Sequence, residues 1–204
     1  MLTVSYALQR IYRDPNVRIL ITNALLQNSK GFLREIKSHM EKNERIRALF
    51  GDITNTDEKW SEDQIIVKNR TVFKKEPTVQ VTSVDKSVVS QHYDLIVADD
   101  VVNREGVSTA EQREKARRYY KDLLDLLEPD GLLLVIGTRW HFDDLYGWLI
   151  EENQDTPDRF PTMIRRVFAD NGEPIFPQKF SKEYIESLRK DKGTYEFNAQ
   201  YNNE

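Results

Sequence analysis

Residues 94–100 read DLIVADD, an apolar run that begins after one aspartate and ends in two. Residues 132–136 (LLLVI) form a second fully apolar run, and residues 17–22 (VRILIT) form a third that contains one arginine. Strands that are apolar on both faces are typical of parallel sheets with helices on both sides. The three runs therefore predict an α/β fold with a mostly parallel sheet flanked by helices.

The segments between these strands have helical or turn patterns. Apolar residues recur at helical spacing in several of them, and residues 108–111 (STAE) have the form of a capping box. Helices are expected at residues 2–13, 29–48, 108–127, 143–153, 181–190 and 193–200. Short β-rich pieces predict a small antiparallel excursion at residues 64–67, 70–73 and 78–84, and one more strand is expected at 163–168.

Composition limits the classes of protein that the chain could be. It has 204 residues with 30 Lys and Arg against 34 Asp and Glu, a formal net charge of −4. The mild acidity argues against a stand-alone cationic DNA coat. The absence of cysteine excludes disulfides, a thiol nucleophile and cysteine-based metal sites. No apolar run approaches the roughly 18–20 residues that cross a bilayer. The opening residues also lack a secretory pattern, so we expect a soluble, intracellular chain with no membrane partner.

The first candidate site is the acidic pair Asp99–Asp100. An acid directly after a buried apolar strand is the pattern of a Walker B motif. In such a motif the first acid holds Mg²⁺ through its water shell, and the next acid orients or deprotonates the attacking water. The simpler interpretation is that two aspartates end a strand and begin a turn.

The second candidate site is the segment 137–141 (GTRWH), which follows the other strongly apolar strand. The hydroxyl of Thr138 could sense a phosphate or the attacking water, and Arg139 could contact phosphate or a neighbouring element. The alternative is an ordinary strand end with a packed tryptophan. His141 has no partner histidine at the spacing of metal ligands, so we expect no metal site there.

Charged residues also mark two helices. Asp143 and Asp144 would lie in the first turn of the helix at 143–153, where carboxylates favour the helix dipole. The helix at 108–127 carries a basic run, for which a solvated face and a DNA or subunit contact stay equally open. Its members are Arg113, Lys115, Arg117, Arg118 and Lys121.

Taken together, these segments resemble the ATPase region of the large terminase subunit of tailed phages, the motor that packages DNA into procapsids. The resemblance is carried, in the order of the family, by residues 18–37, the Phe50-Gly51 pair, and residues 92–102, 137–147, 175–189 and 197–203. Of these, GTRWH followed by an acidic pair and leucine is fairly specific, whereas a Walker B-like strand alone is not. The resemblance implies a P-loop NTPase-like (RecA-like) core.

The resemblance also implies roles and partners. Asp99 corresponds to the aspartate on Mg²⁺, and Asp100 takes the place of the catalytic carboxylate. Thr138 and Arg139 lie in the motif that couples hydrolysis to DNA movement. The implied cofactors are ATP and Mg²⁺. The implied partners are double-stranded DNA, the small terminase subunit, the portal protein and further copies of the chain in a ring. The implied location is the cytoplasm of an infected bacterium.

One departure from the family is decisive for activity. The sequence contains no G-x-x-x-x-G-K-[ST] phosphate loop, whose N–H groups and lysine bind the phosphates. The family places that loop just before a helix that resembles residues 2–13, so Met1 is expected to fall directly after it. The nuclease region of the family is absent as well. We therefore expect residues 1–204 to form a single partial ATPase domain, with a C-terminal subdomain or linker from about residue 170.

Three functions follow from the sequence. The first is a terminase ATPase region that does not hydrolyse ATP alone because the phosphate loop is absent. The second is a non-catalytic, ATPase-like module that binds DNA or a packaging partner. The third, a small-molecule enzyme with a doubly wound sheet, ranks last because the sequence has neither a glycine-rich phosphate loop nor a nucleophile elbow.

Overall fold

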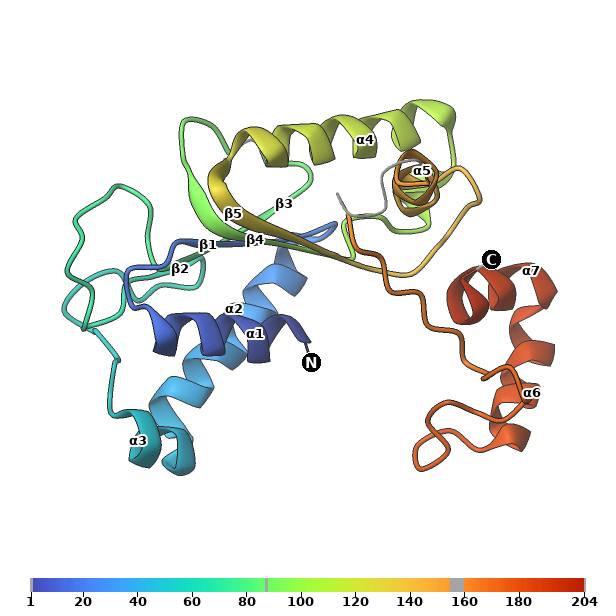
Figure 1. Cartoon of the computed structure of the whole chain (residues 1–204), viewed down its shortest axis with the longest axis horizontal. Coiled ribbons are helices and arrows are strands. Elements are labelled where there is room, and N and C mark those ends of the chain that lie inside the picture. Colours follow the sequence, from blue (N-terminus) through green and yellow to red (C-terminus); the bar gives the residue numbers. More distant parts are fainter. Residues whose placement is uncertain (1, 87, 155–159, 204) are drawn as a thin grey trace. The chain divides into compact units, whose positions relative to one another are not determined.

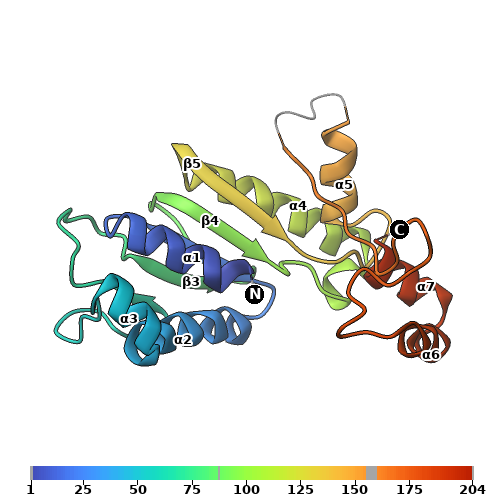
Figure 2. The same cartoon turned by 60° about the horizontal axis from the view of Figure 1, so that its bottom comes forward.

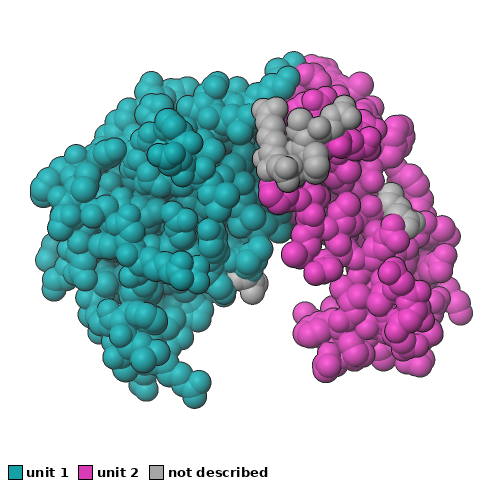
Figure 3. All heavy atoms as spheres, viewed as in Figure 1, with its two compact units in different colours: residues 1–101, 118–136 teal, residues 102–117, 137–204 magenta. Residues whose placement is uncertain are grey.

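The computed structural model describes residues 2–86, 88–154 and 160–203, which fold as two compact units (Figure 3). Unit 1 comprises residues 1–101 and 118–136, and unit 2 comprises residues 102–117 and 137–204. Unit 1 contains the whole sheet. None of the described helices combines the length and the apolar character needed to span a bilayer.

Unit 1 is built on a five-stranded sheet in the order β2-β3-β1-β4-β5. The strands are β1 (Ile19–Asn23), β2 (Gln64–Ile65), β3 (Val79–Ser83), β4 (Tyr93–Asp99) and β5 (Leu127–Ile136). The three interfaces among β3, β1, β4 and β5 are parallel, with Ile21 in register with Val81 on one side and Val97 on the other. Only the short β2 runs antiparallel, against β3. The expectation of a mostly parallel α/β sheet is confirmed.

Helices cover both faces of this sheet. On one face lie α1 (Leu2–Arg13) and α2 (Leu26–Lys42), followed by α3 (Glu44–Phe50), as Figures 1 and 2 show. The apolar core on this face includes Ile11, Leu33 and Ile36, which are at most 1% exposed. The opposite face is covered by the second half of α4 (Ala110–Asp125), residues 118–125 (Figure 1). There the hydroxyls of Tyr119 and Thr22 lie 2.6 Å apart in a hydrogen bond.

At the amino end of the sheet, a buried arginine links three neighbouring strands. Arg18, just before β1, is 6% exposed and forms ion pairs with Asp94 of β4 at 2.6 Å and Glu128 of β5 at 2.7 Å. The Asp94 carboxylate also accepts hydrogen bonds from the Arg18 backbone N–H and Nε. Burial works to raise the pKa of Asp94, but these bonds from Arg18 outweigh it and hold the pKa below its usual range. Arg18 thus fixes the beginning of three adjacent strands.

Several predicted elements of unit 1 differ from the structure. The expected helix at 29–48 is two helices, because Asn43 caps a new helix by accepting a hydrogen bond from Ile46 N–H. The piece at 78–84 joins the main sheet as the parallel strand β3 instead of an antiparallel excursion, and only β2 keeps the predicted direction. Residues 70–73 form no strand because their backbone is fixed by side chains, as described below.

The named regular elements of unit 2 are helices, and long irregular segments connect them. The unit contains the 3₁₀-helix η1 (Glu105–Val107), the first half of α4, α5 (Leu145–Glu152), α6 (Lys182–Lys192), α7 (Thr194–Phe197) and the π-helix η2 (Asn198–Asn202). The α4 cap is formed reciprocally by Thr109 and Gln112, so the box begins one residue later than predicted. The strand expected at 163–168 does not form: Val167 donates to the Tyr201 carbonyl, and Phe168 makes only an isolated bridge with Pro174.

Candidate functional site

The carboxyl end of β4 carries Asp99 and Asp100, the acids predicted to bind a metal and activate water. The backbone around them is held by neighbouring strands. The Asp99 carbonyl accepts a bond of 2.7 Å from the Asn23 amide, and Asp100 N–H donates to the Ile136 carbonyl at 2.9 Å. Ala24 N–H in turn donates to the Asp100 carbonyl at 2.9 Å. The two acids therefore lie in a fixed turn at the edge where β1, β4 and β5 end.

The two acids have different surroundings. Asp99 is half-buried, and its carboxylate accepts a hydrogen bond from the hydroxyl of Thr3, a residue of the first turn of α1 that is 1% exposed. Burial raises the pKa of the Asp99 carboxyl above its ordinary value, and the Thr3 bond offsets part of that rise. Asp100 is exposed and adopts φ of 48°, the left-handed region that aspartate tolerates better than most residues. The Asp99 carboxyl is thus partly shielded from water, whereas Asp100 is exposed.

Sequence reasoning missed the residue that positions this turn. Asn23 ends β1, is 3% exposed, and donates to Asp99 while its own oxygen accepts from Leu25 N–H at 2.9 Å and the Asn28 amide at 3.1 Å. A polar residue at the end of the apolar run 17–22 was the available signal. Asn23 is a positioning residue, since its contacts are to the backbone of Asp99 and to its own loop.

The side-chain oxygens at this edge are too few to bind a metal ion unless a bound ligand supplies further oxygen atoms. Within residues 2–86, 88–154 and 160–203, no group of three or more His, Asp or Glu could hold an ion. Mg²⁺ is commonly bound by one or two carboxylates together with substrate phosphates and water. The Asp99 carboxylate and the Thr3 hydroxyl therefore suit a magnesium ion that arrives with phosphates, and they do not suit a free ion.

Thr138 and Arg139 follow Gly137, the residue at which the chain enters unit 2 after β5. Thr138 is half-buried. The Arg139 guanidinium donates to the Phe142 carbonyl at 2.7 Å, and its Nε is buried without a hydrogen-bond partner in the described part of the chain. This guanidinium therefore closes a turn of its own segment. Its predicted contact with phosphate stays a prediction.

Asp144 organises that turn. Its side chain is fully buried and accepts hydrogen bonds from the N–H groups of Trp140 at 2.8 Å, His141 at 3.2 Å and Gly147 at 2.9 Å. The last of these caps α5, so the predicted capping role is confirmed for Asp144. Gly147 must lack a side chain, because a Cβ there would lie 2.3 Å from the Phe142 carbonyl oxygen. The segment 139–147 is thus a tightly built turn.

Asp143 has a different role from the predicted cap. Its carboxylate forms ion pairs with Arg113 and Arg117 of α4. Burial works to raise the pKa of Asp143, but the bonds from Arg117 and Arg113 outweigh it and hold the pKa below its usual range. Two of the five basic residues predicted to contact DNA are therefore half-buried and bound within the chain. The exposed members of the set are Lys115, Arg118 and Lys121.

The turn at 139–147 lies beside the C-terminal helices within unit 2. A pocket of about 420 Å³ is lined by His141 and Phe142 together with residues of α7 and η2. Arg104 forms an ion pair with Glu196, and its guanidinium lies 6.0 Å from the centre of the Trp140 ring. Two segments that carried the sequence resemblance, 137–147 and 197–203, therefore meet in one unit.

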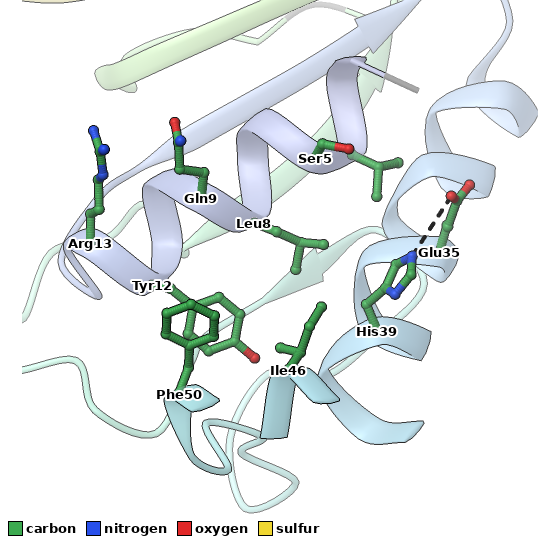
Figure 4. A pocket seen from close by; sticks show the side chains of 10 residues that line it. Ser5, Leu8, Gln9, Tyr12, Arg13, Glu35, His39, Ile46 and Phe50 are labelled. Carbon is green, nitrogen blue, oxygen red and sulfur yellow. Dashed lines mark ion pairs between the residues drawn. The ribbon is translucent and has the colours of Figure 1, made fainter. Parts of the chain in front are cut away.

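A larger pocket, of about 520 Å³, lies among α1, α2 and α3 and holds no predicted site residue (Figure 4). The Tyr12 ring lies beside Phe50, with ring centres 5.0 Å apart, and its hydroxyl points towards Ile46. At the rim, His39 and Glu35 approach to 4.0 Å. Burial, followed by the charge of Asp52, raises the pKa of Tyr12. The exposed surface of the pocket is mostly apolar.

The Tyr12 hydroxyl leads to a prediction about stability. It is buried and has no hydrogen-bond partner among the described residues, an arrangement that costs roughly 1–3 kcal/mol. Tyr12→Phe is therefore expected to raise the free energy of unfolding by about 1 kcal/mol, measured by urea denaturation. The matched control is Tyr93→Phe, which removes a buried hydroxyl bonded to Gln80 and Gln91 and should lower stability. Equal losses in both variants would contradict the prediction.

Comparison with known proteins adds no assignment, since neither a protein-family model nor a curated protein sequence matches this chain.

Proposed function

We propose that the chain is the ATPase region of a DNA-packaging motor of the terminase type. The observation that carries the proposal is the position of Asp99 and Asp100 at the carboxyl end of β4, between the parallel strands β1 and β5. Ligands of open α/β sheets bind beyond the carboxyl ends of the strands. An acid pair at that edge is suited to a nucleotide that arrives with magnesium.

Each residue has a defined part in this proposal. Magnesium bound with ATP would neutralise phosphate charge during transfer. Asp99 would hold the water shell of that ion, with its carboxylate oriented by the Thr3 hydroxyl. Asp100, which is exposed, would orient the attacking water. Thr138 and Arg139 would couple hydrolysis to movement of double-stranded DNA. In the working motor the chain would assemble as a ring with the small terminase subunit and the portal protein.

The proposal includes the expectation that this chain does not hydrolyse ATP by itself. The sequence has no phosphate loop, so several charge-assisted hydrogen bonds to phosphate are missing. Each of these is worth roughly 1.5–3 kcal/mol. Micromolar binding amounts to only about 8 kcal/mol in total. Losing three such bonds removes most of that affinity, even with Asp99 in place.

The test compares the 204-residue chain with the same chain extended at its N-terminus by a strand and a G-x-x-x-x-G-K-S loop. We expect no MgATP turnover from the chain alone. We expect DNA-stimulated turnover from the extended chain, lost by at least about a hundredfold in Asp100→Asn. Circular dichroism and thermal melting identify extended chains that have not folded, and adding the loop segment in trans gives a second route. Turnover by the chain alone, or turnover of the extended chain that survives Asp100→Asn, would overturn the proposal.

A second candidate function is a non-catalytic module that binds DNA or a packaging partner. It is favoured by the engagement of Arg139 with the Phe142 carbonyl and of Asp99 with Thr3, which gives both groups structural roles. This function predicts DNA binding that Asp99→Asn and Asp100→Asn leave unchanged, together with an extended chain that stays inactive. The two experiments therefore separate the candidates.

A further inference from the structure

We propose that the loop of residues 68–75, between β2 and β3, is a contact surface for duplex DNA. In this surface lysines would bind the phosphates and Phe73 would enter the minor groove as an apolar wedge. The choice of DNA as partner rests on the proposed function. The surface itself is identified by its charge, its exposure and its rigidity.

The charge of the loop is unlike that of the rest of the chain. The segment 64–75 contains no acid, although the whole chain has a net charge of −4. Its four cations are Lys68, Arg70, Lys74 and Lys75. Lys68 and Lys74 are exposed and form no ion pair among the described residues, while Lys75 has only a long contact of 3.9 Å with Glu76. The loop thus presents a locally positive surface on an acidic chain.

The side chain between these lysines is apolar and unprotected. Phe73 is 97% exposed, and the neighbouring Val72 is 42% exposed. Proteins that bend or grip the minor groove commonly insert Phe, Leu or Ile between base steps while lysines and arginines bind the flanking phosphates. A single aromatic ring and one valine give little apolar area for a lipid surface, where stable anchoring needs more than one strong signal. These features favour nucleic acid over a membrane.

The loop is also held in place before any partner binds. The Asn16 side-chain oxygen accepts hydrogen bonds from the N–H groups of Thr71 and Val72, both at 2.9 Å, and its amide donates to the Thr71 hydroxyl at 3.2 Å. From the other side, Arg70 Nε donates to the Val72 carbonyl at 3.0 Å. Because the backbone is fixed in this way, binding would cost little ordering entropy.

Arg70 adds charge beneath the loop. Both terminal guanidinium nitrogens are buried and have no hydrogen-bond partner in the part of the chain that the structure describes. Among the described residues, no carboxylate lies within hydrogen-bond distance of these two nitrogens. Glu76, Asp94 and Glu58 lie near enough to offset part of this charge, and the remainder adds to the field of Lys68 and Lys74.

The experiment measures binding of a short fluorescein-labelled DNA duplex by anisotropy at about 50 to 200 mM potassium chloride. We expect Lys68→Gln/Lys74→Gln to weaken binding and to reduce the slope of log affinity against log salt by about 2, since each phosphate contact contributes about 0.9. Phe73→Ala should weaken binding about fivefold to tenfold while the slope stays unchanged, because it removes an apolar contact. All three side chains are exposed, so the variants should fold, which thermal melting checks.

The matched control variant is Arg118→Gln/Lys121→Gln on α4, which removes the same number of positive charges from another exposed surface. Unchanged binding by this variant supports the loop; an equal or larger loss overturns it. Absence of duplex binding by the wild-type chain at the lowest salt, or binding only to phosphatidylserine vesicles, also overturns it. If the loop variants behave as expected and the extended chain shows no ATP turnover, DNA binding by residues 68–75 is supported. The proposal that the chain belongs to an ATP-driven packaging motor is then overturned.

Discussion

Asp144→Ala is expected to lower the free energy of unfolding of unit 2 by about 3 kcal/mol. The carboxylate is fully buried and accepts three backbone N–H groups, and a hydrogen bond to a charged group is worth roughly 1.5–3 kcal/mol. Alanine would leave the N–H groups of Trp140 and His141 without this acceptor and would remove the cap of α5. Hydrogen exchange of the amides of residues 140–147, together with urea denaturation, measures the effect.

The control for this prediction is Asp144→Asn, which keeps one side-chain oxygen and loses the charge. We expect it to retain the hydrogen bond to Gly147 N–H and to cost less than alanine. Because Arg139 donates to the Phe142 carbonyl within the same turn, amide exchange should also accelerate there in the alanine variant. An alanine variant as stable as the wild type would show that water replaces the carboxylate without cost.

Arg18→Met is expected to lower the free energy of unfolding of unit 1 by roughly 3 kcal/mol at neutral pH. Removing one partner of a buried ion pair leaves charge without compensation, which commonly costs roughly 3–5 kcal/mol, and here two carboxylates lose their partner. We expect a loss at the lower end of this range because the Asp94 and Glu128 side chains are each 32% exposed. Urea denaturation at neutral pH checks the magnitude.

The pH dependence of this cluster has a definite sign. The pKa of Asp94 is lowered in the folded state, so its stabilisation is complete above the ordinary aspartate pKa of about 3.9 and is lost as the pH falls through the folded-state value. The difference between wild type and Arg18→Met should therefore shrink at acid pH. Lys30→Met, which breaks the ion pair with the exposed Glu62 in the same unit, is the control and should change stability little. A constant difference from neutral to acid pH would contradict this account.

The parts of the fold that the sequence predicts are those that depend on residues close together in the sequence. The apolar runs predicted the position of β4 and the second half of β5, and helical spacing predicted α1. The first half of β5 was missed because Pro129, Asp130 and Gly131 favour a turn. The break between α2 and α3 was missed because the segment stays amphipathic across Asn43, and only its cap shows where a new helix begins. The direction of β3 was missed because strand pairing joins residues distant in sequence, such as Ile21 and Val81.

In the candidate site, too, local patterns were predictable and contacts between distant residues were not. Asp99 and Asp100 stood out because they follow an apolar strand. The side chains that hold them were invisible, since Thr3 and Asn23 are 96 and 76 residues away from Asp99 in the sequence. The pairing of Asp143 with Arg113 and Arg117 crosses at least 26 residues, so local rules assigned that acid to the helix dipole instead. Roles of single residues therefore needed the structure, whereas the location of the edge did not.

The place of β5 at the end of the sheet has a consequence for how the chain behaves in solution. Natural sheets protect an outer strand with charges, proline or bulges, because its unpaired N–H and C=O groups attract other extended chains. In β5 such features are confined to Glu128, Pro129 and Asp130, whereas residues 132–135 are all apolar and Leu132 is 42% exposed. Two copies that meet along this strand could continue each other's ladder. The fraction of monomer would then fall as the protein concentration rises.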